Sequence, residues 1–359
     1  MTNFLLAGGG TAGHVNPLLS LADAISADNS SNKVWALGTA EGLESRLVPA
    51  RGYELLTISK VPLPRRLNWA ALFFPFKFAG SVFRCMQIIK AKQIDAVVGF
   101  GGYASAPAYL AAKITRVPIV VHEANALPGW ANKLGARWAS AVGTAFKNTP
   151  INKGHFVGMP LRKEIEAIVA ERNQVKAREF FGLESNLPTL LVTGGSLGAK
   201  RINEALVASR KNLIAAGIQV LHIVGDKSEF LPLSESGYLR LGYCDRMDLA
   251  IAAADLAVSR SGASTVSEFA AVGLPSIFVP YPVGNGEQAL NAAEIVAAGG
   301  AVIVADREFD ADFVANQVVA LASDNRRLAK MADAAKSVGV ADGTARLLTL
   351  IKGVLQDRS

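Results

Sequence analysis

Short apolar runs alternate with segments of helical periodicity along most of the chain. An apolar run of four to eight residues bounded by turn residues is typical of a strand buried on both faces, and apolar residues three and four positions apart are typical of an amphipathic helix. The runs predict strands at residues 4–7, 34–37, 55–58, 96–99, 119–122, 190–193, 220–224, 256–259, 276–279 and 301–304. The periodic segments predict helices at residues 17–27, 104–114, 199–216, 263–272, 288–298 and 310–321.

The order strand, helix, strand is typical of parallel α/β layers. A polar, weakly patterned region at residues 147–187 interrupts this order, and a new strand with its own glycine-rich turn follows it. A chain of 359 residues also exceeds what one hydrophobic core usually serves. We therefore predict an α/β protein of two doubly wound, Rossmann-like domains, residues 1–160 and 161–340, that face a cleft where ligands bind. An apolar helical face at about 341–355 predicts a last helix that packs back on the first domain.

The composition predicts a folded cytoplasmic protein. Half of the residues are apolar and 19% are charged, which excludes a disordered chain. No basic segment precedes the first apolar run, so we expect no secretory signal. The longest apolar stretch, residues 69–83, is interrupted by Pro75 and Lys77 and is too short to span a bilayer. Cys85 and Cys244 match no metal or redox spacing, which suits reduced thiols.

The net charge of +7 favours an anionic partner: nucleic acid, acidic lipid or a phosphorylated substrate. The placement of the charges favours lipid, because basic residues alternate with aromatic residues in one segment. On a helical wheel the aromatic side chains share a stripe with two cations at its edge. That stripe has two interpretations, core packing and membrane-surface contact, and the density of rings and flanking cations favours the membrane. The basic residues are Arg65, Arg66, Lys77, Arg84, Lys90 and Lys92, and the stripe is Trp69, Phe73, Phe76 and Phe83.

The first predicted strand ends in a glycine-rich turn, residues 8–13, that reads GGGTAG. Main-chain N–H groups of such a turn face an anion at a helix N-terminus, as in dinucleotide-binding proteins. A nicotinamide enzyme also needs an acid at the end of the second strand, but residues 34–39 read VWALGT and Glu41 comes late. His14 follows the turn and can accept a proton near neutral pH, although a histidine that only caps the loop remains the alternative.

Two further glycine turns follow predicted strands. Residues 194–198 read GGSLG and precede Lys200 and Arg201, which suggests a second phosphate-binding turn. The alternative is that this turn only packs its helix against its strand. Residues 99–103 read GFGGY and place Tyr103 beside the glycines.

Polar residues follow several other strands, where they make poor core material and suit contacts to sugars. Glu268 would lie one turn into a helix, where a carboxylate can accept from both hydroxyls of a ribose. Arg162 follows a rigid proline turn and would reach a diphosphate, or else lie solvated on the surface. These contacts point to a nucleotide-sugar. The segments are His122 to Asn125 with Asn132, residues 260–268, and Glu287, Gln288 and Asn291.

Metal or other cofactors are not expected. Asp310 and Asp312 have a spacing that some metal-dependent sugar transferases use, but they open a helix and suit N-terminal capping. The four histidines do not pair at ligand spacing.

Taken together, the motifs at residues 11–14, 99–103, 122–125, 158–162, 194–199, 260–268 and 287–291 resemble the MurG family of bacterial peptidoglycan glycosyltransferases, in family order over nearly the full length. The resemblance implies a GT-B fold and an inverting transfer of N-acetylglucosamine from UDP-N-acetylglucosamine to the 4-hydroxyl of the muramoyl sugar of lipid I. The product would be lipid II with a β-1,4 linkage. It also implies peripheral attachment to the cytoplasmic face of the plasma membrane.

The resemblance implies roles for individual residues. We expect His14 to act as the base, with Glu123 as the fallback, and no metal to be required. We expect acceptor or diphosphate contacts from Gly10, Tyr103, Asn132 and Asn291. The implied donor contacts are Thr11, Ala12, Gly13, Asn125, Arg162, Ser196, Cys244, Ala263, Ser264, Thr265, Val266, Ser267, Glu268 and Gln288.

The chain departs from the family pattern at Ala12, where many members have glycine, and at Met159, where many have asparagine. Ala12 keeps the loop only if its φ is negative. The expected partners are UDP-N-acetylglucosamine, lipid I, an anionic membrane surface and other cell-wall synthesis proteins, and no nucleic acid. The alternatives are a hexosyltransferase for another lipid acceptor, a UDP-N-acetylglucosamine 2-epimerase, a nicotinamide dehydrogenase and a non-catalytic membrane adaptor.

Overall fold

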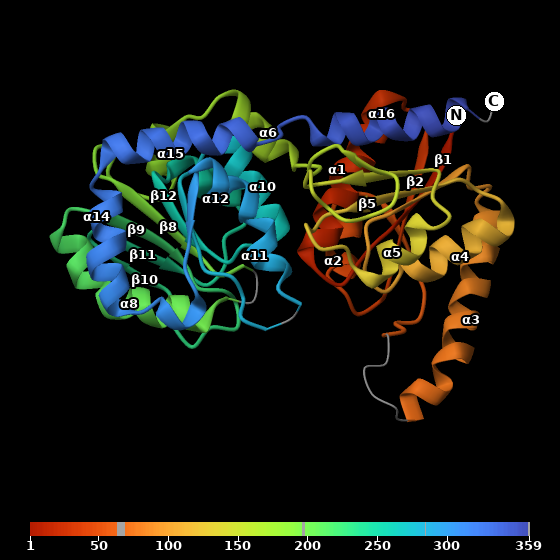
Figure 1. Ribbon diagram of the computed structural model, residues 1–359, viewed down its shortest axis with the longest axis horizontal. Helices are drawn as coiled ribbons and strands as arrows, with labels where there is room; N and C mark the ends of the chain where they lie inside the picture. Colours follow the sequence, from red (N-terminus) through yellow and green to blue (C-terminus); the bar gives the residue numbers. More distant parts are fainter. Residues whose placement is uncertain (63–68, 196–197, 284, 358–359) are drawn as a thin grey trace. The chain divides into compact units, whose positions relative to one another are not determined.

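The protein consists of two compact units, Met1–Arg162 with Asp342–Ser359, and Lys163–Ala341. The computed structural model describes residues 1–62, 69–195, 198–283 and 285–357, without the side chains of residues 69–71. Arg65, Arg66, Ser196 and the side chain of Trp69 therefore lie outside the described residues. Each unit is built on one mainly parallel sheet (Figure 1).

The first unit alternates strands and helices through Ala136 and receives one helix from the end of the chain (Figure 1). Its strands are β1 Asn3–Ala7, β2 Lys33–Gly38, β3 Glu54–Thr57, β4 Ala96–Gly99, β5 Ile119–Glu123, β6 Ala141–Thr144 and β7 Gly154–Phe156. Its helices are α1 Ala12–Asp28, α2 Glu44–Ala50, α3 Trp69–Ala91, α4 Ser105–Thr115, α5 Trp130–Ala136 and α16 Gly343–Gln356.

The strands of this unit pair in parallel in the order β3-β2-β1-β4-β5-β6-β7 within the described residues. The apolar runs of β1 and β4 are buried on both faces because helices cover both sides of the sheet. On one side the core includes α3, α4 and α5, and on the other it includes α1, α2 and α16. Leu347 and Ile351 of α16 are fully buried in this second core, so the last helix packs on the first unit.

The second unit repeats the architecture. Its strands are β8 Thr189–Thr193, β9 Gln219–Ile223, β10 Leu233–Glu235, β11 Tyr238–Leu241, β12 Leu256–Ser259, β13 Ser276–Phe278 and β14 Ala301–Ile303. Its helices are α6 Lys163–Ala170, α7 Gln174–Phe180, α8 Lys200–Ala215, α9 Met247–Ala253, α10 Ala263–Val272, α11 Glu287–Asn291, α12 Ala293–Ala298, α13 Ala311–Phe313, α14 Val319–Ala322 and α15 Asn325–Val338, with a 3-10 turn at Asp306–Glu308 and a π-helical segment at Val314–Val318.

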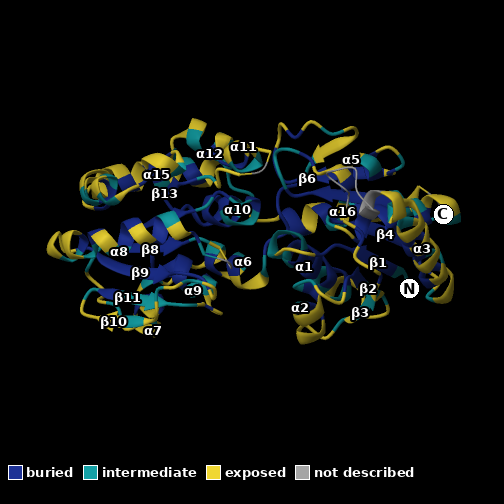
Figure 2. Cartoon of the chain, turned by 90° about the horizontal axis from the view of Figure 1, so that it is seen from below, coloured by how far each residue is buried: buried dark blue, intermediate teal, exposed yellow. Residues whose placement is uncertain are grey.

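The second sheet has the order β10-β11-β9-β8-β12-β13-β14, and β10 is its antiparallel member within the described residues. Helix α8 and the helical segments between Val314 and Met331 pack into one core with β8, β9 and β12. The strands β8, β9, β12 and β13 are buried while the outer helix faces are exposed, as the burial colouring shows (Figure 2). The prediction of an α/β protein with two doubly wound sheets is confirmed.

Each predicted strand is present, but several elements were not predicted. The short strands β6, β7, β10 and β11 were not predicted; β7 and β10 are mostly exposed and contain no apolar run. The polar region at residues 147–187 contains the helices α6 and α7, each with two buried side chains, which explains its weak pattern. The helix expected at 288–298 is two helices that meet at Ala292.

Helix α3 is longer than the apolar stretch suggested. The 20 residues Leu72–Ala91 are long and apolar enough to cross a membrane by length and composition, contrary to the prediction that the stretch is too short. However, Val82, Cys85 and Ile89 on the carboxyl-terminal half of α3 are buried in the core of the first unit. A helix held in this way packs as part of a domain.

Candidate active site

The glycine turns after β1 and β4 lie next to each other. These two strands are neighbours at the point where the strand order reverses, which is where α/β sheets usually bind ligands. Gly102 has a φ of +79°, and a Cβ at this position would lie 2.5 Å from the carbonyl oxygen of Gly9. Glycine is therefore required here both for its backbone conformation and for the close approach of the two turns.

The buried carboxylate of Glu44 holds the first glycine turn through a hydrogen bond. Glu44, the first residue of α2, is 1% exposed. One oxygen of its carboxylate accepts a hydrogen bond from the N–H of Gly10 at 2.8 Å. The other accepts from the N–H of Thr39 at 2.9 Å and from the Thr39 hydroxyl at 2.8 Å. The turn after β1 and the turn after β2 are thus tied to one side chain.

Burial alone would raise the pKa of Glu44, but the hydrogen bonds from Gly10 and Thr39 outweigh it and the net pKa is lowered. The carboxylate is therefore charged at neutral pH. In a dinucleotide-binding site an acid near this strand end binds a ribose. Here the acid is Glu44, and its carboxylate already accepts hydrogen bonds from the main-chain N–H groups of Gly10 and Thr39. It is therefore not available to a ribose, which explains why a glycine pattern of the dinucleotide type occurs without a nicotinamide site.

His14 lies in the first turn of α1, half-buried beside both glycine turns. Its Nδ1 is 3.0 Å from the carbonyl oxygen of Gly9. Because a carbonyl only accepts, Nδ1 carries the hydrogen and the Nε2 of the neutral ring keeps its lone pair. A Cβ at Gly101 would lie 3.2 Å from this Nε2, so the nitrogen faces the turn after β4. His14 is therefore arranged to accept a proton at Nε2.

Glu123 at the end of β5 is 2% exposed and accepts hydrogen bonds at both carboxylate oxygens. The donors are the N–H and side-chain amide of Asn125 at 2.9 and 3.5 Å, the N–H of Gly129 at 3.0 Å and the amide of Asn132 at 2.9 Å. Asn132 also donates to the carbonyl of His122 and accepts from the Tyr109 hydroxyl at 2.7 Å. This arrangement fixes the loop after β5 and leaves Asn132 2% exposed.

His122 is fully buried and its Nε2 is 3.0 Å from the carbonyl oxygen of Gly158. Burial lowers its pKa to about 4, although the hydrogen bond to Gly158 acts in the opposite direction. The ring is therefore neutral at physiological pH. It connects β5 to the segment before Arg162, which is a structural role.

The remaining residues of the first turn keep the loop regular. Ala12 begins α1 and does not have a positive φ. In the described part of the chain, the non-glycine residues with positive φ are Gln93, Arg116 and Lys153. The condition for alanine in place of glycine is therefore met. Thr11 precedes the helix in an extended conformation and is exposed, and Gly13 is half-buried. Tyr103 is 42% exposed at the turn after β4.

In the second unit the turns after β8 and β12 also follow neighbouring strands where the order reverses. Gly195 and Gly198 have φ of +81° and +77°, and Gly198 packs against the carbonyl of Val224. Gly262 precedes α10 in an extended conformation. The hydroxyls of Ser261 and Ser264 are buried and have no hydrogen-bond partner among the described residues. Unpaired donors at a helix N-terminus suit an anionic ligand.

Side chains around α10 and α11 complete this edge of the second sheet. Glu268 is 8% exposed in α10, and Ala263 and Val266 are also buried, whereas Thr265 and Ser267 are half-buried. Asn291 is fully buried and donates to the carbonyl of Ser261 at 3.2 Å, so it supports the turn after β12. Gln288 accepts from the N–H of Tyr281 at 2.9 Å.

Three further expected residues lie between the elements. Arg162 is half-buried between β7 and α6. Cys244 is 8% exposed after β11, and burial raises the pKa of its thiol. Met159 is 2% exposed, and Gly343 at the start of α16 packs against its carbonyl. Asp310, expected to open a helix, is the N-cap of α13 and accepts from the N–H of Phe313.

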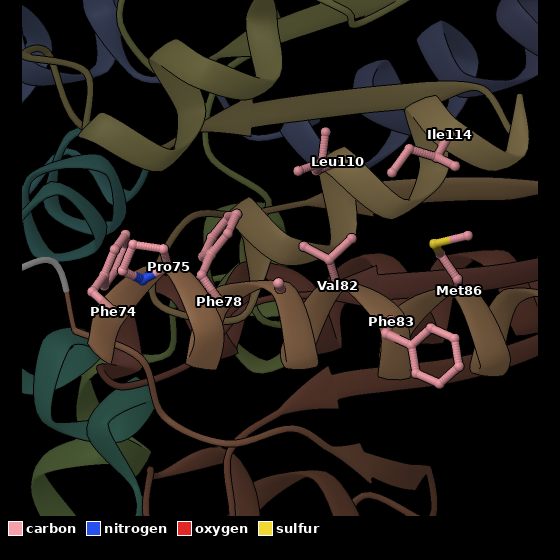
Figure 3. Close-up of a pocket in the computed structure, with 9 residues that line it drawn as sticks. Phe74, Pro75, Phe78, Val82, Phe83, Met86, Leu110 and Ile114 are labelled. Carbon is pink, nitrogen blue, oxygen red and sulfur yellow. The ribbon is translucent and has the colours of Figure 1, made fainter. Parts of the chain in front are cut away.

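The expected membrane stripe on α3 is exposed where it is described. Phe73, Phe76 and Phe83 are 52%, 75% and 60% exposed. Apolar residues of the helix, Phe83 at the rim among them, line an open groove of about 490 Å³ with Leu110 and Ile114 of α4. In Figure 3, Phe78 and Met86 point toward α4 while Phe83 points away. Helix α3 therefore has an apolar face turned to α4 and exposed rings outside it.

Sequence reasoning missed Glu44, whose contacts depend on the meeting of two separate turns. The sequence was searched for an acid at the end of β2 that could bind a ribose, and Glu41 was the acid considered for that role. It also missed Ser105, whose hydroxyl donates to the carbonyl of Ala7 at 2.8 Å and accepts from the N–H of Gly101 at 3.0 Å. The serine thereby ties β1 to the turn after β4.

Comparison with known proteins identifies the family. The glycosyltransferase family 28 N-terminal domain matches residues 4–144, and the glycosyltransferase family 28 C-terminal domain matches residues 189–347. The chain belongs to glycosyltransferase family 28. Its membership confirms the predicted glycosyltransferase and GT-B fold, and it removes the nicotinamide dehydrogenase and the membrane adaptor from consideration.

Relatives of this family 28 chain are similar over the full length. A protein of Clavibacter sepedonicus is 54% identical over 359 residues, which are 100% of this chain and 98% of the relative. A protein of Streptomyces coelicolor is 46% identical over 99% of each chain. Both are named UDP-N-acetylglucosamine--N-acetylmuramyl-(pentapeptide) pyrophosphoryl-undecaprenol N-acetylglucosamine transferase.

Two solved structures are also similar to this family 28 chain. The crystal structure of Acinetobacter baumannii MurG has a TM-score of 0.78 and 28% identity, and the match covers 98% of this chain and 100% of that one. The S. aureus MnaA–UDP structure has a TM-score of 0.71 over 99% of this chain and 97% of that one. At 15% identity, it shows the shared fold alone.

Proposed function

We propose that the chain transfers N-acetylglucosamine from UDP-N-acetylglucosamine to the 4-hydroxyl of the N-acetylmuramoyl sugar of lipid I, which forms lipid II. The reaction inverts the anomeric carbon and makes a β-1,4 linkage. The observation that carries this proposal is the 54% identity, over all 359 residues, to a relative that is named for this transfer. The two glycine-lined strand edges, one in each unit, provide the chemistry.

In this mechanism the first unit holds the acceptor. The acceptor hydroxyl gives its proton to Nε2 of His14 as its oxygen bonds to the anomeric carbon of the donor. The hydrogen on Nδ1 is held by Gly9 at 3.0 Å, which keeps Nε2 free for this role. Glu123 is less suited as the base because its oxygens already accept bonds from Asn125, Gly129 and Asn132. We assign Glu123 and Asn132 to positioning.

We assign the first glycine turn to the binding of a diphosphate, and we expect Gly10 and Tyr103 to lie next to that diphosphate. Glu44 restricts this assignment, because its carboxylate already occupies the N–H of Gly10. The N–H groups in the first turn of α1, which begins at Ala12, and the exposed Thr11 follow Gly10 directly in the chain. These groups suit an anion at a helix N-terminus.

The second unit holds the donor. As the anomeric carbon bonds to the acceptor, its bond to the diphosphate breaks and negative charge develops on UDP. We assign the N-terminus of α10, the buried hydroxyl of Ser264 and the glycines Gly195 and Gly198 after β8 to stabilising this charge. We assign Glu268 to the ribose hydroxyls, and Gln288 and Cys244 to further donor contacts of this unit. Asn291 holds the turn through the Ser261 carbonyl.

The site is proposed to work at the cytoplasmic face of the plasma membrane, with the protein attached to its surface. Lipid I stays in the bilayer, so the acceptor unit needs contact with lipid. The exposed rings of Phe73, Phe76 and Phe83, with Lys77 and Arg84 on the same helix, support this attachment. Rings and cations of this kind suit a headgroup layer with acidic lipids.

The decisive experiment is transfer of radiolabelled sugar from UDP-N-acetylglucosamine to a lipid I analogue. The expected result is a labelled disaccharide lipid, with UDP-N-acetylgalactosamine as the control that gives much less. Absence of label from the lipid overturns the proposal. Conversion of UDP-N-acetylglucosamine with no acceptor present would instead indicate the 2-epimerase, and transfer to another polyprenyl-linked sugar alone would indicate a different hexosyltransferase.

A further inference from the structure

The peptide group between Gly9 and Gly10 makes a hydrogen bond at each of its two ends. Its carbonyl oxygen, which belongs to Gly9, is 3.0 Å from Nδ1 of His14. Its N–H group, which belongs to Gly10, donates to the carboxylate of Glu44 at 2.8 Å. The carboxylate and the imidazole ring are therefore connected through one planar peptide unit. The connection gives Glu44 a route to the proposed base that support of the turn does not require.

The carboxylate of Glu44 is enclosed by main chain on several sides. A Cβ added at Gly9, Gly38 or Gly42 would collide with the Glu44 side chain. Glu44 is 1% exposed, so little water surrounds its charge. A charge in such an environment is weakly screened and acts on groups beyond the atoms that it touches.

The first effect of this charge is on the hydrogen of the His14 ring. A peptide N–H that donates to a carboxylate shifts electrons toward the carbonyl oxygen of the same peptide, because both belong to one resonance system. The Gly9 carbonyl thereby becomes a stronger acceptor for a hydrogen on Nδ1. The Thr11 hydroxyl, 3.4 Å from Nδ1, fits either form of the ring. The polarised carbonyl therefore selects the form with a lone pair on Nε2.

The second effect is on the charge that the ring gains. The two hydrogen bonds and the peptide between them place the charged oxygen of Glu44 no more than about 8 Å from Nδ1 of His14. When Nε2 accepts a proton the ring becomes a cation, and an opposite charge at this distance stabilises it. Because His14 is half-buried, solvent weakens the attraction, and we expect a contribution of about tenfold to the rate.

We propose that Glu44 is a positioning residue of the transfer reaction and that it acts on His14 through the Gly9–Gly10 peptide. It selects the form of the ring that accepts at Nε2, and it stabilises the ring once the acceptor hydroxyl has given up its proton. An aspartate has this role behind the histidine of serine hydrolases, where it contacts the ring directly. The inference rests on the proposed function, in which His14 is the base.

Three variants of the full chain separate the charge of Glu44 from its shape. Glu44→Gln keeps the shape and removes the charge, whereas Glu44→Asp keeps the charge but is one CH2 group too short for the same hydrogen bonds. Thr39→Val is the matched control, because it removes a hydroxyl that donates to the same carboxylate at 2.8 Å and leaves the charge in place.

Sugar transfer to a lipid I analogue gives the first measurement. We expect kcat to fall about tenfold in Glu44→Gln and less than about threefold in Glu44→Asp and Thr39→Val, with the KM for UDP-N-acetylglucosamine unchanged in all three. A purely structural role predicts the opposite order, since Asp disturbs the turn at least as much as Gln. An equal or larger loss of kcat in Glu44→Asp than in Glu44→Gln would overturn the proposal.

Nuclear magnetic resonance of 15N-labelled histidine rings gives the second measurement and needs no substrate. The neutral His14 ring is expected to carry its hydrogen on Nδ1 in the wild type and in Thr39→Val. In Glu44→Gln the fraction with the hydrogen on Nε2 should rise at least about threefold. An unchanged ring in Glu44→Gln would overturn the proposal. If the wild type transfers no sugar, the proposed function fails, but the ring measurement still decides whether Glu44 controls His14.

Discussion

Replacement of Glu44 by glutamine tests whether this carboxylate holds the glycine turn. The change preserves the shape of the side chain and removes its charge. One carboxylate oxygen becomes an NH2 group that must face either the N–H of Gly10 or the N–H of Thr39, now 2.8 and 2.9 Å from the oxygens. Two donors then oppose each other at a site where the side chain is 1% exposed.

The loss of one hydrogen bond to a buried charged acceptor is expected to lower the free energy of unfolding by about 2 to 3 kcal/mol. Glu41→Gln is the matched control. That side chain is 73% exposed and its ion pair with Lys60 at 3.8 Å is expected to contribute less than about 0.5 kcal/mol.

The effect of Glu44→Gln depends on pH in a defined direction. The hydrogen bonds lower the folded-state pKa of Glu44 below the ordinary value of 4.5. The stabilisation by its charge is therefore complete above that value and is lost as the pH falls through the folded-state pKa. The difference between wild type and Glu44→Gln should shrink in this acidic range.

Denaturant unfolding measures the stability of each variant, and amide hydrogen exchange at Gly10 and Thr39 measures the turn itself. Exchange at both amides should accelerate at least about tenfold in Glu44→Gln and remain normal in Glu41→Gln. If Glu44→Gln unfolds and exchanges like Glu41→Gln, the carboxylate does not hold the turn.

Three other changes test the remaining assignments. His14→Ala should lower turnover about a hundredfold with unfolding unchanged, and a near-normal rate in single-turnover assays would remove His14 as the base. Glu268→Gln should raise the KM for UDP-N-acetylglucosamine about tenfold while the KM for the acceptor stays the same; equal changes in both would contradict a donor contact. Ile351→Ala should lower the free energy of unfolding by about 2 to 4 kcal/mol, measured by denaturant, because the side chain is fully buried between α16 and the rest of the first unit. A loss below 1 kcal/mol would show that α16 is not part of this core.

The local pattern of the chain was sufficient for much of the fold. Strands such as β1 and β8 are continuous apolar runs because both faces of a parallel sheet are covered, and that property is visible without knowing the neighbours. The glycine turns after β1, β4 and β8 were also predictable. Positive φ values, such as those of Gly101 and Gly195, favour glycine, and glycine is visible in the sequence. The same local information placed His14 directly after the first glycine turn, although the helix expected from residue 17 begins at Ala12.

Which turns meet was decided by the tertiary structure. The neighbours of β1 are β2 and β4, and this order brings Gly102 onto the carbonyl of Gly9 and Glu44 under Gly10. Strand order depends on contacts between residues far apart in the chain, which periodicity does not encode. The two sides of α3 are a second case: rings and cations alternate in its sequence, but only the tertiary packing separated the apolar groove against α4 from a second groove, near the end of β3, that Lys77, Ser81 and Arg84 line.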